Sequence, residues 1–128
     1  MRLLLDTHAL LWWLDGDRRL SVPAQSAISD VKNQVFVSAA SAWEVATKVR
    51  IGKLPGAVEV ADRFGEIIAD QQFIALSIAI EHARRAGLLA GEHRDPFDRM
   101  LIAQSRIEGL ALVSNETLFD AFGVERLW

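Results

Sequence analysis

The 128-residue chain contains no cysteine, which excludes disulfides, thiolate metal sites and a cysteine nucleophile. A chain without cysteine is typical of a reducing compartment, and we expect a cytoplasmic protein. No apolar run approaches the roughly 20 residues needed to cross a bilayer. The apolar N-terminus is interrupted by Asp6 and His8, so it does not have the pattern of a signal peptide. We therefore expect no association with a membrane.

Two common site motifs are also absent. There is no His-Glu-x-x-His or Cys-His zinc pattern, and no Gly-rich phosphate loop of the Walker type. The sequence also lacks an excess of positive charge, since its formal net charge is −3. This balance argues against a protein that simply binds the nucleic-acid backbone. An acidic site that holds divalent cations remains compatible with nucleic acid, because the metals reverse the local charge.

Short apolar runs alternate with segments of helical periodicity, and 51% of the residues are hydrophobic. The pattern predicts one α/β domain over residues 1–128, with a parallel sheet of four to five short strands flanked by helices. The expected strands are 2–5, 35–37, 73–76, 110–113 and an edge strand at 124–127. The expected helices are 8–14, 23–31, 57–71, 78–90, 95–108 and 116–122, with a further helix that Ser38 or Ser41 caps and that runs to residue 51.

Acidic residues follow several of these expected strands. Asp6 directly follows the first strand, Glu44 lies in the helix after the second, and Asp98 lies in the opening turn of a later helix. Glu116 comes just after the strand that ends at Val113. Sites of parallel α/β folds lie at the carboxyl ends of strands, so these acids can converge there. Gathered carboxylates favour hard cations such as Mg²⁺ or Mn²⁺.

Each acid also has a simpler explanation. Asp95, directly before Pro96, fits an N-cap, and Glu116 fits an acid in the first turn of a helix. Glu44 could be a surface residue that pairs with Lys48 at i,i+4. Asp6 is the exception, because an acid that ends a buried strand is costly without a partner.

Five segments of the chain together resemble the PIN-domain ribonucleases, specifically the VapC-type toxins of bacterial VapBC toxin–antitoxin pairs. The resemblance covers nearly the whole chain and implies a single PIN-like domain. The segments are Leu3-Leu4-Leu5-Asp6-Thr7-His8-Ala9-Leu10-Leu11-Trp12, Ser41-Ala42-Trp43-Glu44-Val45-Ala46-Thr47-Lys48, Gly52-Lys53-Leu54, Asp95-Pro96-Phe97-Asp98-Arg99-Met100-Leu101-Ile102-Ala103-Gln104 and Leu112-Val113-Ser114-Asn115-Glu116.

The resemblance implies a set of site residues. The catalytic metal ligands would be Asp6, Glu44 and Asp98, with Glu116 as the fourth and Asp95 as the competing third ligand. The family commonly has an Asp after a Thr-x pair where this chain has Ser114-Asn115-Glu116, so the fourth position departs from the pattern. The hydroxyl groups of Thr7 and Ser114 would hold carboxylates or waters, although helix capping also explains these residues. The basic side chains of Lys48, Arg94 and Arg99 would hold RNA phosphates, although ordinary surface charge also explains them.

The resemblance also implies an activity and partners. The activity would be endoribonuclease cleavage of structured RNA, such as tRNA or rRNA, by a water that Mg²⁺ or Mn²⁺ activates. A VapB-like antitoxin would cover the pocket, and the toxin would form a homodimer. The apolar stretch at Trp12-Trp13 and the helix at 57–71 are candidate contact surfaces.

Two other functions fit parts of the sequence. The first is a PIN-like binding module with weak catalysis that acts through its antitoxin complex, which the altered Ser114-Asn115-Glu116 segment favours. The second is a magnesium-dependent phosphatase or phospho-acceptor domain on a similar sheet. Such a phosphatase favours two adjacent acids after the first strand, whereas Asp6 stands alone between Leu5 and Thr7.

Overall fold

A computed structural model describes residues 1–128 as one five-stranded sheet with helices on both faces. All neighbouring strands are parallel, in the order β3-β2-β1-β4-β5, which confirms the predicted α/β fold. The strands are β1 (Arg2–Leu5), β2 (Gln34–Ser38), β3 (Ile74–Leu76), β4 (Ala111–Val113) and β5 (Arg126–Leu127). The α-helices are α1 (Thr7–Asp15), α2 (Val22–Ser29), α3 (Ala39–Arg50), α4 (Val58–Asp62), α5 (Phe64–Asp70), α6 (Ile80–Leu88) and α7 (Pro96–Glu108), and the 3₁₀ turns are η1 (Pro55–Ala57) and η2 (Thr117–Phe122).

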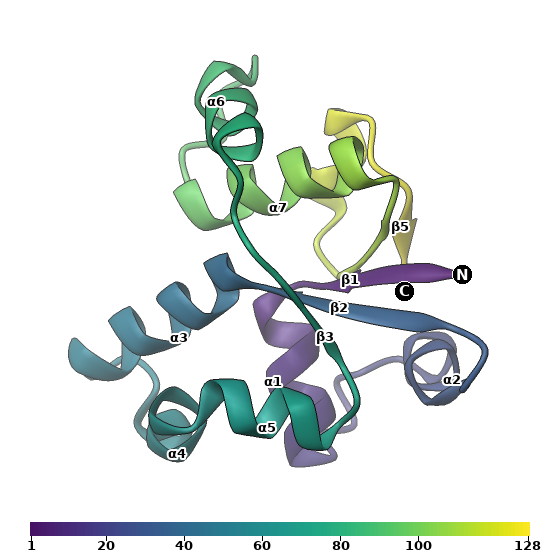
Figure 1. Cartoon of the computed structure of the whole chain (residues 1–128), viewed down its shortest axis with the longest axis vertical. Helices are drawn as coiled ribbons and strands as arrows, with labels where there is room; N and C mark the ends of the chain where they lie inside the picture. Colours follow the sequence, from purple (N-terminus) through teal and green to yellow (C-terminus); the bar gives the residue numbers. More distant parts are fainter.

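The central strand β1 separates two layers of core. Leu3 and Leu5 face the cluster that α1, α2 and α5 cover, whereas Leu4 faces the cluster beneath α7 and η2. All three leucines are fully buried, as expected for a strand covered on both faces. Figure 1 shows α6 and α7 on one side of the sheet and α1, α4 and α5 on the other. No helix combines the length and the apolar character needed to span a membrane.

The register of the sheet aligns the ends of the three inner strands. Leu5 pairs with Val37 of β2 on one side and with Val113 of β4 on the other. The next residue, Asp6, still donates its backbone N–H to the carbonyl of Val113, at 3.1 Å. The residues that directly follow β1 and β4 are therefore neighbours at the carboxyl edge of the sheet.

The single helix predicted over residues 57–71 is wrong, because the chain divides there into α4 and α5. Arg63 interrupts the helix with φ −124° and ψ 29°. Val60 and Ala61 of α4 pack against the cluster that includes Val45, whereas Ile68 of α5 belongs to the main core. Phe64, the first residue of α5, packs against both clusters, so the break at Arg63 lies where the chain passes from one cluster to the other.

The helix that carries the later acids begins and ends where the sequence predicts. Asp95 caps α7, Pro96 takes its first position, and Gly109 ends it in the left-handed region with φ 66°. Ser38, one of the two predicted candidates, caps α3. Trp12 and Trp13 are half-buried rather than exposed, because both pack against the main core.

Candidate functional site

Asp6 is buried at the junction between β1 and α1, with 4% of its surface exposed. It caps α1 by accepting the N–H of Ala9 at 2.7 Å, a role that the sequence had suggested for Thr7. Burial raises the pKa of Asp6 to about 6, although hydrogen bonds from the Ser114 hydroxyl and from Ala9 act in the opposite direction. Any nearby positive charge would stabilise the ionised form of this buried carboxyl group.

Glu44 of α3 is also buried, and both of its carboxylate oxygens have partners. The Thr7 hydroxyl donates to Oε1 at 2.6 Å, and the Lys48 ammonium lies 2.5 Å from Oε2. The predicted i,i+4 pair is therefore present, but it is part of the interior and not of a solvated surface. Lys48 acts as the internal counter-ion of Glu44. Partial burial lowers the pKa of Lys48, but Glu44, Asp95 and Asp98 together raise it above its usual range.

Asp98 lies in the first turn of α7, and Asp95 directly precedes that helix. Burial raises the pKa of Asp98 to about 6, a hydrogen bond from His93 lowers it, and the charges of Asp95 and Glu116 add to the rise. The ring Nε2 of His93 lies 2.8 Å from Oδ2 of Asp98. Asp95 Oδ1 accepts the N–H groups of Phe97 and Asp98 at 2.9 and 3.1 Å, so this carboxylate is engaged in the cap.

Glu116 lies after β4 and directly before η2. Its backbone N–H donates to the Ser114 hydroxyl at 3.0 Å, and its side chain is partly exposed. The charge of Glu116 raises the pKa of both Asp6 and Asp98, so all three carboxylates share one electrostatic environment. The structure thus brings the four predicted acids to the same edge of the sheet.

The four acids form an oxygen-rich site in which Lys48, paired with Glu44, is the permanent countercharge, while His8 lies near Asp6 and His93 contacts Asp98. As the side chains stand, no three acidic or histidine side chains converge tightly enough to hold one ion. Glu44 is engaged by Thr7 and Lys48. The chemistry of the donors nevertheless fits Mg²⁺ or Mn²⁺, since hard oxygen ligands with raised pKa values gain most from a divalent charge.

The three basic residues predicted to hold phosphates occupy different environments. Lys48 pairs with Glu44, and Arg94 is exposed in the loop before α7. Arg99 donates instead to the backbone carbonyls of Ala86, Leu89 and His93. Its guanidinium therefore fixes the α6–α7 loop and is not free to bind a phosphate.

One contact in the site could not be derived from the sequence. His93 reaches Asp98 only because Arg99 folds the α6–α7 loop back onto the start of α7. A histidine five residues before an acid belongs to no motif of its own. The only available signal was its position beside Arg94 and Asp95.

Comparisons with known proteins identify the family and the fold. The sequence profile of the PIN domain matches residues 3–125. Ribonuclease VapC16 of Mycobacterium tuberculosis is 52% identical over 31 residues, a match that spans 24% of this chain and 22% of that protein. The structure resembles VapBC2 from Rickettsia felis bound to a promoter DNA fragment, with a TM-score of 0.71, 13% identity and full coverage of both chains. It also resembles VapBC-1 from nontypeable Haemophilus influenzae, with a TM-score of 0.69, 13% identity and coverage of 98% and 96%.

Proposed function

The chain belongs to the PIN-domain family, and from this premise we propose that it is the toxin endoribonuclease of a VapBC-type toxin–antitoxin pair. The observation that carries the proposal is the placement of Asp6, Glu44 and Asp98 along the same carboxyl edge of the sheet. The short match to a ribonuclease and the likeness to toxin–antitoxin complexes support the same activity.

Asp6, Glu44 and Asp98 are the proposed ligands of Mg²⁺ or Mn²⁺, with Glu116 as a fourth. Burial holds Asp6 and Asp98 near a pKa of about 6, so a divalent cation would stabilise their ionised forms at neutral pH. When bound, the ion supplies the Lewis acidity that makes water nucleophilic and that stabilises the departing oxygen of the phosphodiester.

Neighbouring side chains orient these ligands. The Thr7 hydroxyl directs Oε1 of Glu44, the Ser114 hydroxyl directs Asp6, and His93 directs Oδ2 of Asp98. Asp95 is engaged as the N-cap of α7, which supports Asp98 as the proposed third ligand. Lys48 pairs with Oε2 of Glu44, so an ion that used this oxygen would compete with the Lys48 ammonium for it.

The partners follow from the same proposal. We propose that a VapB-like antitoxin covers the acidic edge, because the similar solved structures from Rickettsia felis and Haemophilus influenzae are VapBC assemblies. The proposed substrate is a structured RNA such as tRNA or rRNA, and the proposed assembly of the toxin is a homodimer.

The experiment is to incubate the purified, antitoxin-free protein with total RNA in Mg²⁺ or Mn²⁺, and then with EDTA. Discrete cleavage products are expected with either ion and none with EDTA. Asp6→Asn should remove cleavage, because Asn cannot supply the charge. Cleavage that persists in EDTA would contradict the proposal. RNA binding without any cleavage would favour the catalytically weak binding module instead.

A further inference from the structure

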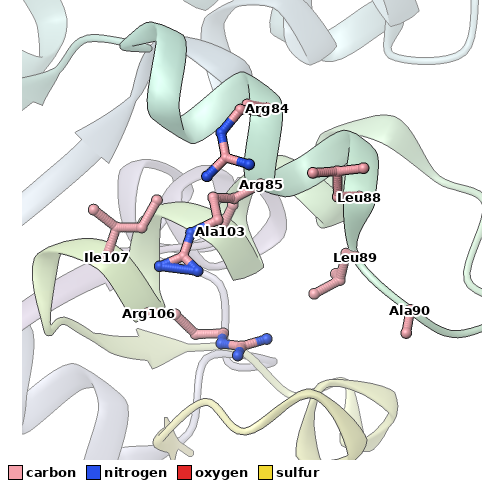
Figure 2. A pocket seen from close by; sticks show the side chains of 8 residues that line it. All are labelled: Arg84, Arg85, Leu88, Leu89, Ala90, Ala103, Arg106 and Ile107. Atoms are coloured by element: carbon pink, nitrogen blue, oxygen red, sulfur yellow. The ribbon is translucent and has the colours of Figure 1, made fainter.

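A cavity of about 410 Å³ lies between α6 and α7, outside the acidic site. Three arginines line it, Arg84 and Arg85 from α6 and Arg106 from α7. Figure 2 shows their guanidinium groups gathered on one side of the cavity, with Leu88, Leu89 and Ala90 along the other. The cavity therefore combines a cationic wall with an apolar one.

The positive charge of this cavity is only partly neutralised. Arg84 binds the carboxylate of Glu81 at 2.5 Å, and Arg85 shares the same carboxylate at 3.4 Å. The side chain of Arg106 forms no ion pair and no hydrogen bond within the chain. Three guanidinium groups thus face one exposed carboxylate, in a chain whose net charge is −3.

The lining matches the chemistry of a nucleotide. Guanidinium groups present planar forks of donors that fit phosphate oxygens. The opposite wall includes Leu88 and Leu89, whose apolar side chains can pack against a ribose or the face of a base. Leu88 is 70% exposed, so this apolar surface is open to a ligand.

The cavity and the acidic site share helix α7. Asp98 and Arg106 are eight residues apart on it, roughly 12 Å along the helix axis at 1.5 Å per residue. Arg99 lies between them and is engaged with backbone carbonyls, so it leaves the phosphates to other residues. An RNA strand that passes from the acids along α7 would next meet Arg106 and Arg85.

We propose that this cavity binds a phosphodiester segment of the RNA substrate at a distance from the cleaved bond. The proposal rests on the nuclease function proposed above. Arg85 and Arg106 are the contacts that set affinity, since Arg84 is the arginine most engaged by Glu81. The cavity thus supplies the positive surface that the overall composition lacks.

The test compares two double variants of the full chain by fluorescence anisotropy, with a labelled 12-nucleotide oligouridylate in EDTA, which prevents cleavage. One is Arg85→Gln with Arg106→Gln. The matched control is Arg18→Gln with Lys32→Gln, which removes the same charge from exposed residues without ion pairs beyond α1 and α2. The slope of log affinity against log salt should fall by about 1.4 in the first variant, or about 0.7 for each lost contact, and should stay unchanged in the control.

Equal slopes in the two double variants would overturn the proposal, as would a wild-type chain that does not bind oligouridylate. Thermal unfolding should be the same in both variants, because all four side chains are exposed. An oligoglutamate peptide tests the competing occupant: if the Arg85/Arg106 variant loses this peptide but keeps its RNA slope, the cavity is a docking site for an acidic protein segment, and the RNA proposal fails.

The outcomes for the two proposals are separable. If RNA binding depends on Arg85 and Arg106 but no cleavage occurs in Mg²⁺ or Mn²⁺, the nuclease proposal fails and the proposed RNA site in the cavity stands. If cleavage depends on the metal but the salt slopes of the two double variants are unchanged, the cavity proposal fails and the nuclease proposal stands.

Discussion

The two ends of α7 border surfaces of opposite character. At its start, Asp98 lies among buried carboxylates whose oxygens accept hydrogen bonds from neighbouring hydroxyl, ammonium, imidazole and backbone groups. Toward its end, Arg106 lines an open cavity and has no partner. The first surface is rich in hydrogen-bonded carboxylates, whereas the second is exposed and rich in positive charge.

This contrast separates chemistry from recognition. Groups that hold a cation must be fixed in place, which burial and hydrogen bonds achieve at some cost in stability. Groups that hold an RNA backbone gain from exposure and mobility, because their attraction is electrostatic and not stereospecific. Substitutions near the acids should therefore change activity and metal binding, and substitutions at the cavity should change RNA affinity and its salt dependence.

The largest effect is expected for Asp6→Asn. Loss of one buried metal ligand removes several kcal/mol of transition-state stabilisation, so the rate of RNA cleavage should fall by about 1000-fold or more. Asn retains an oxygen that can cap α1, which keeps the fold intact. Single-turnover cleavage of total RNA is the measurement, with circular dichroism as the folding control. Activity within tenfold of wild type would remove Asp6 from the ligand set.

The proposed third and fourth ligands, Asp98 and Glu116, should contribute unequally to the rate of RNA cleavage. Asp98→Asn is expected to reduce cleavage by about 100-fold or more, and Glu116→Gln by about tenfold, because Glu116 is partly exposed and departs from the family pattern. Both variants are assayed at saturating Mg²⁺ and again across a metal titration. A reversed order would make Glu116 the stronger ligand.

Asp95→Asn is the companion variant, and loss of cleavage with intact folding would contradict the assignment of Asp95 as a cap.

Thr7→Val should reduce cleavage by about 10- to 100-fold, since it removes the hydroxyl that holds Oε1 of Glu44. Thr7→Ser keeps the hydroxyl and should retain most of the activity. The comparison is made as kcat and as the Mg²⁺ concentration at half-maximal rate. Equal activity of the two variants would mean that Thr7 acts by packing alone.

The raised pKa of Asp6 predicts an unusual pH dependence of stability. A carboxyl with a native pKa of about 6 and an unfolded value of 3.8 binds more protons when folded. The metal-free protein should therefore lose stability as the pH rises from about 4 to above 6, by about 3 kcal/mol from this group. Urea unfolding in EDTA measures it, and Asp6→Asn should be more stable than wild type at pH 7.5 but not at pH 4. A difference between the two proteins that does not change with pH would contradict the origin assigned to this shift.

The smallest effect concerns Lys48, the internal counter-ion. Lys48→Met should lower the unfolding temperature of the metal-free protein, because Glu44 loses its counter-ion. It should also raise the affinity for Mn²⁺ by about three- to tenfold, because the Lys48 ammonium no longer competes with the metal for Oε2 of Glu44. Lys32→Met is the matched control, since Lys32 is exposed and has no ion pair. Unchanged Mn²⁺ affinity in calorimetry would show that Lys48 does not compete with the metal.

Much of the site could be predicted from the sequence because strand ends are local features. Asp6 follows an unbroken apolar run and Asp95 precedes Pro96, so their places at a strand end and a helix start are encoded by adjacent residues. The break of the 57–71 helix at Arg63 and the His93–Asp98 contact depend on distant packing, which no local pattern contains. Likewise, the cavity forms only where α6 lies against α7, so Arg84, Arg85 and Arg106 were scattered charges in the sequence.

The central claim is that the acidic edge of the sheet, and no other surface, binds the divalent ion. Substoichiometric Mn²⁺ added to the ¹⁵N-labelled, antitoxin-free protein tests it directly, because the ion broadens the NMR signals of nearby amides. Broadening is expected first at the amides of Thr7, Glu44, Asp98 and Ser114, and it should be lost in Asp6→Asn. Broadening that centres elsewhere, or that persists unchanged in Asp6→Asn, would contradict the account.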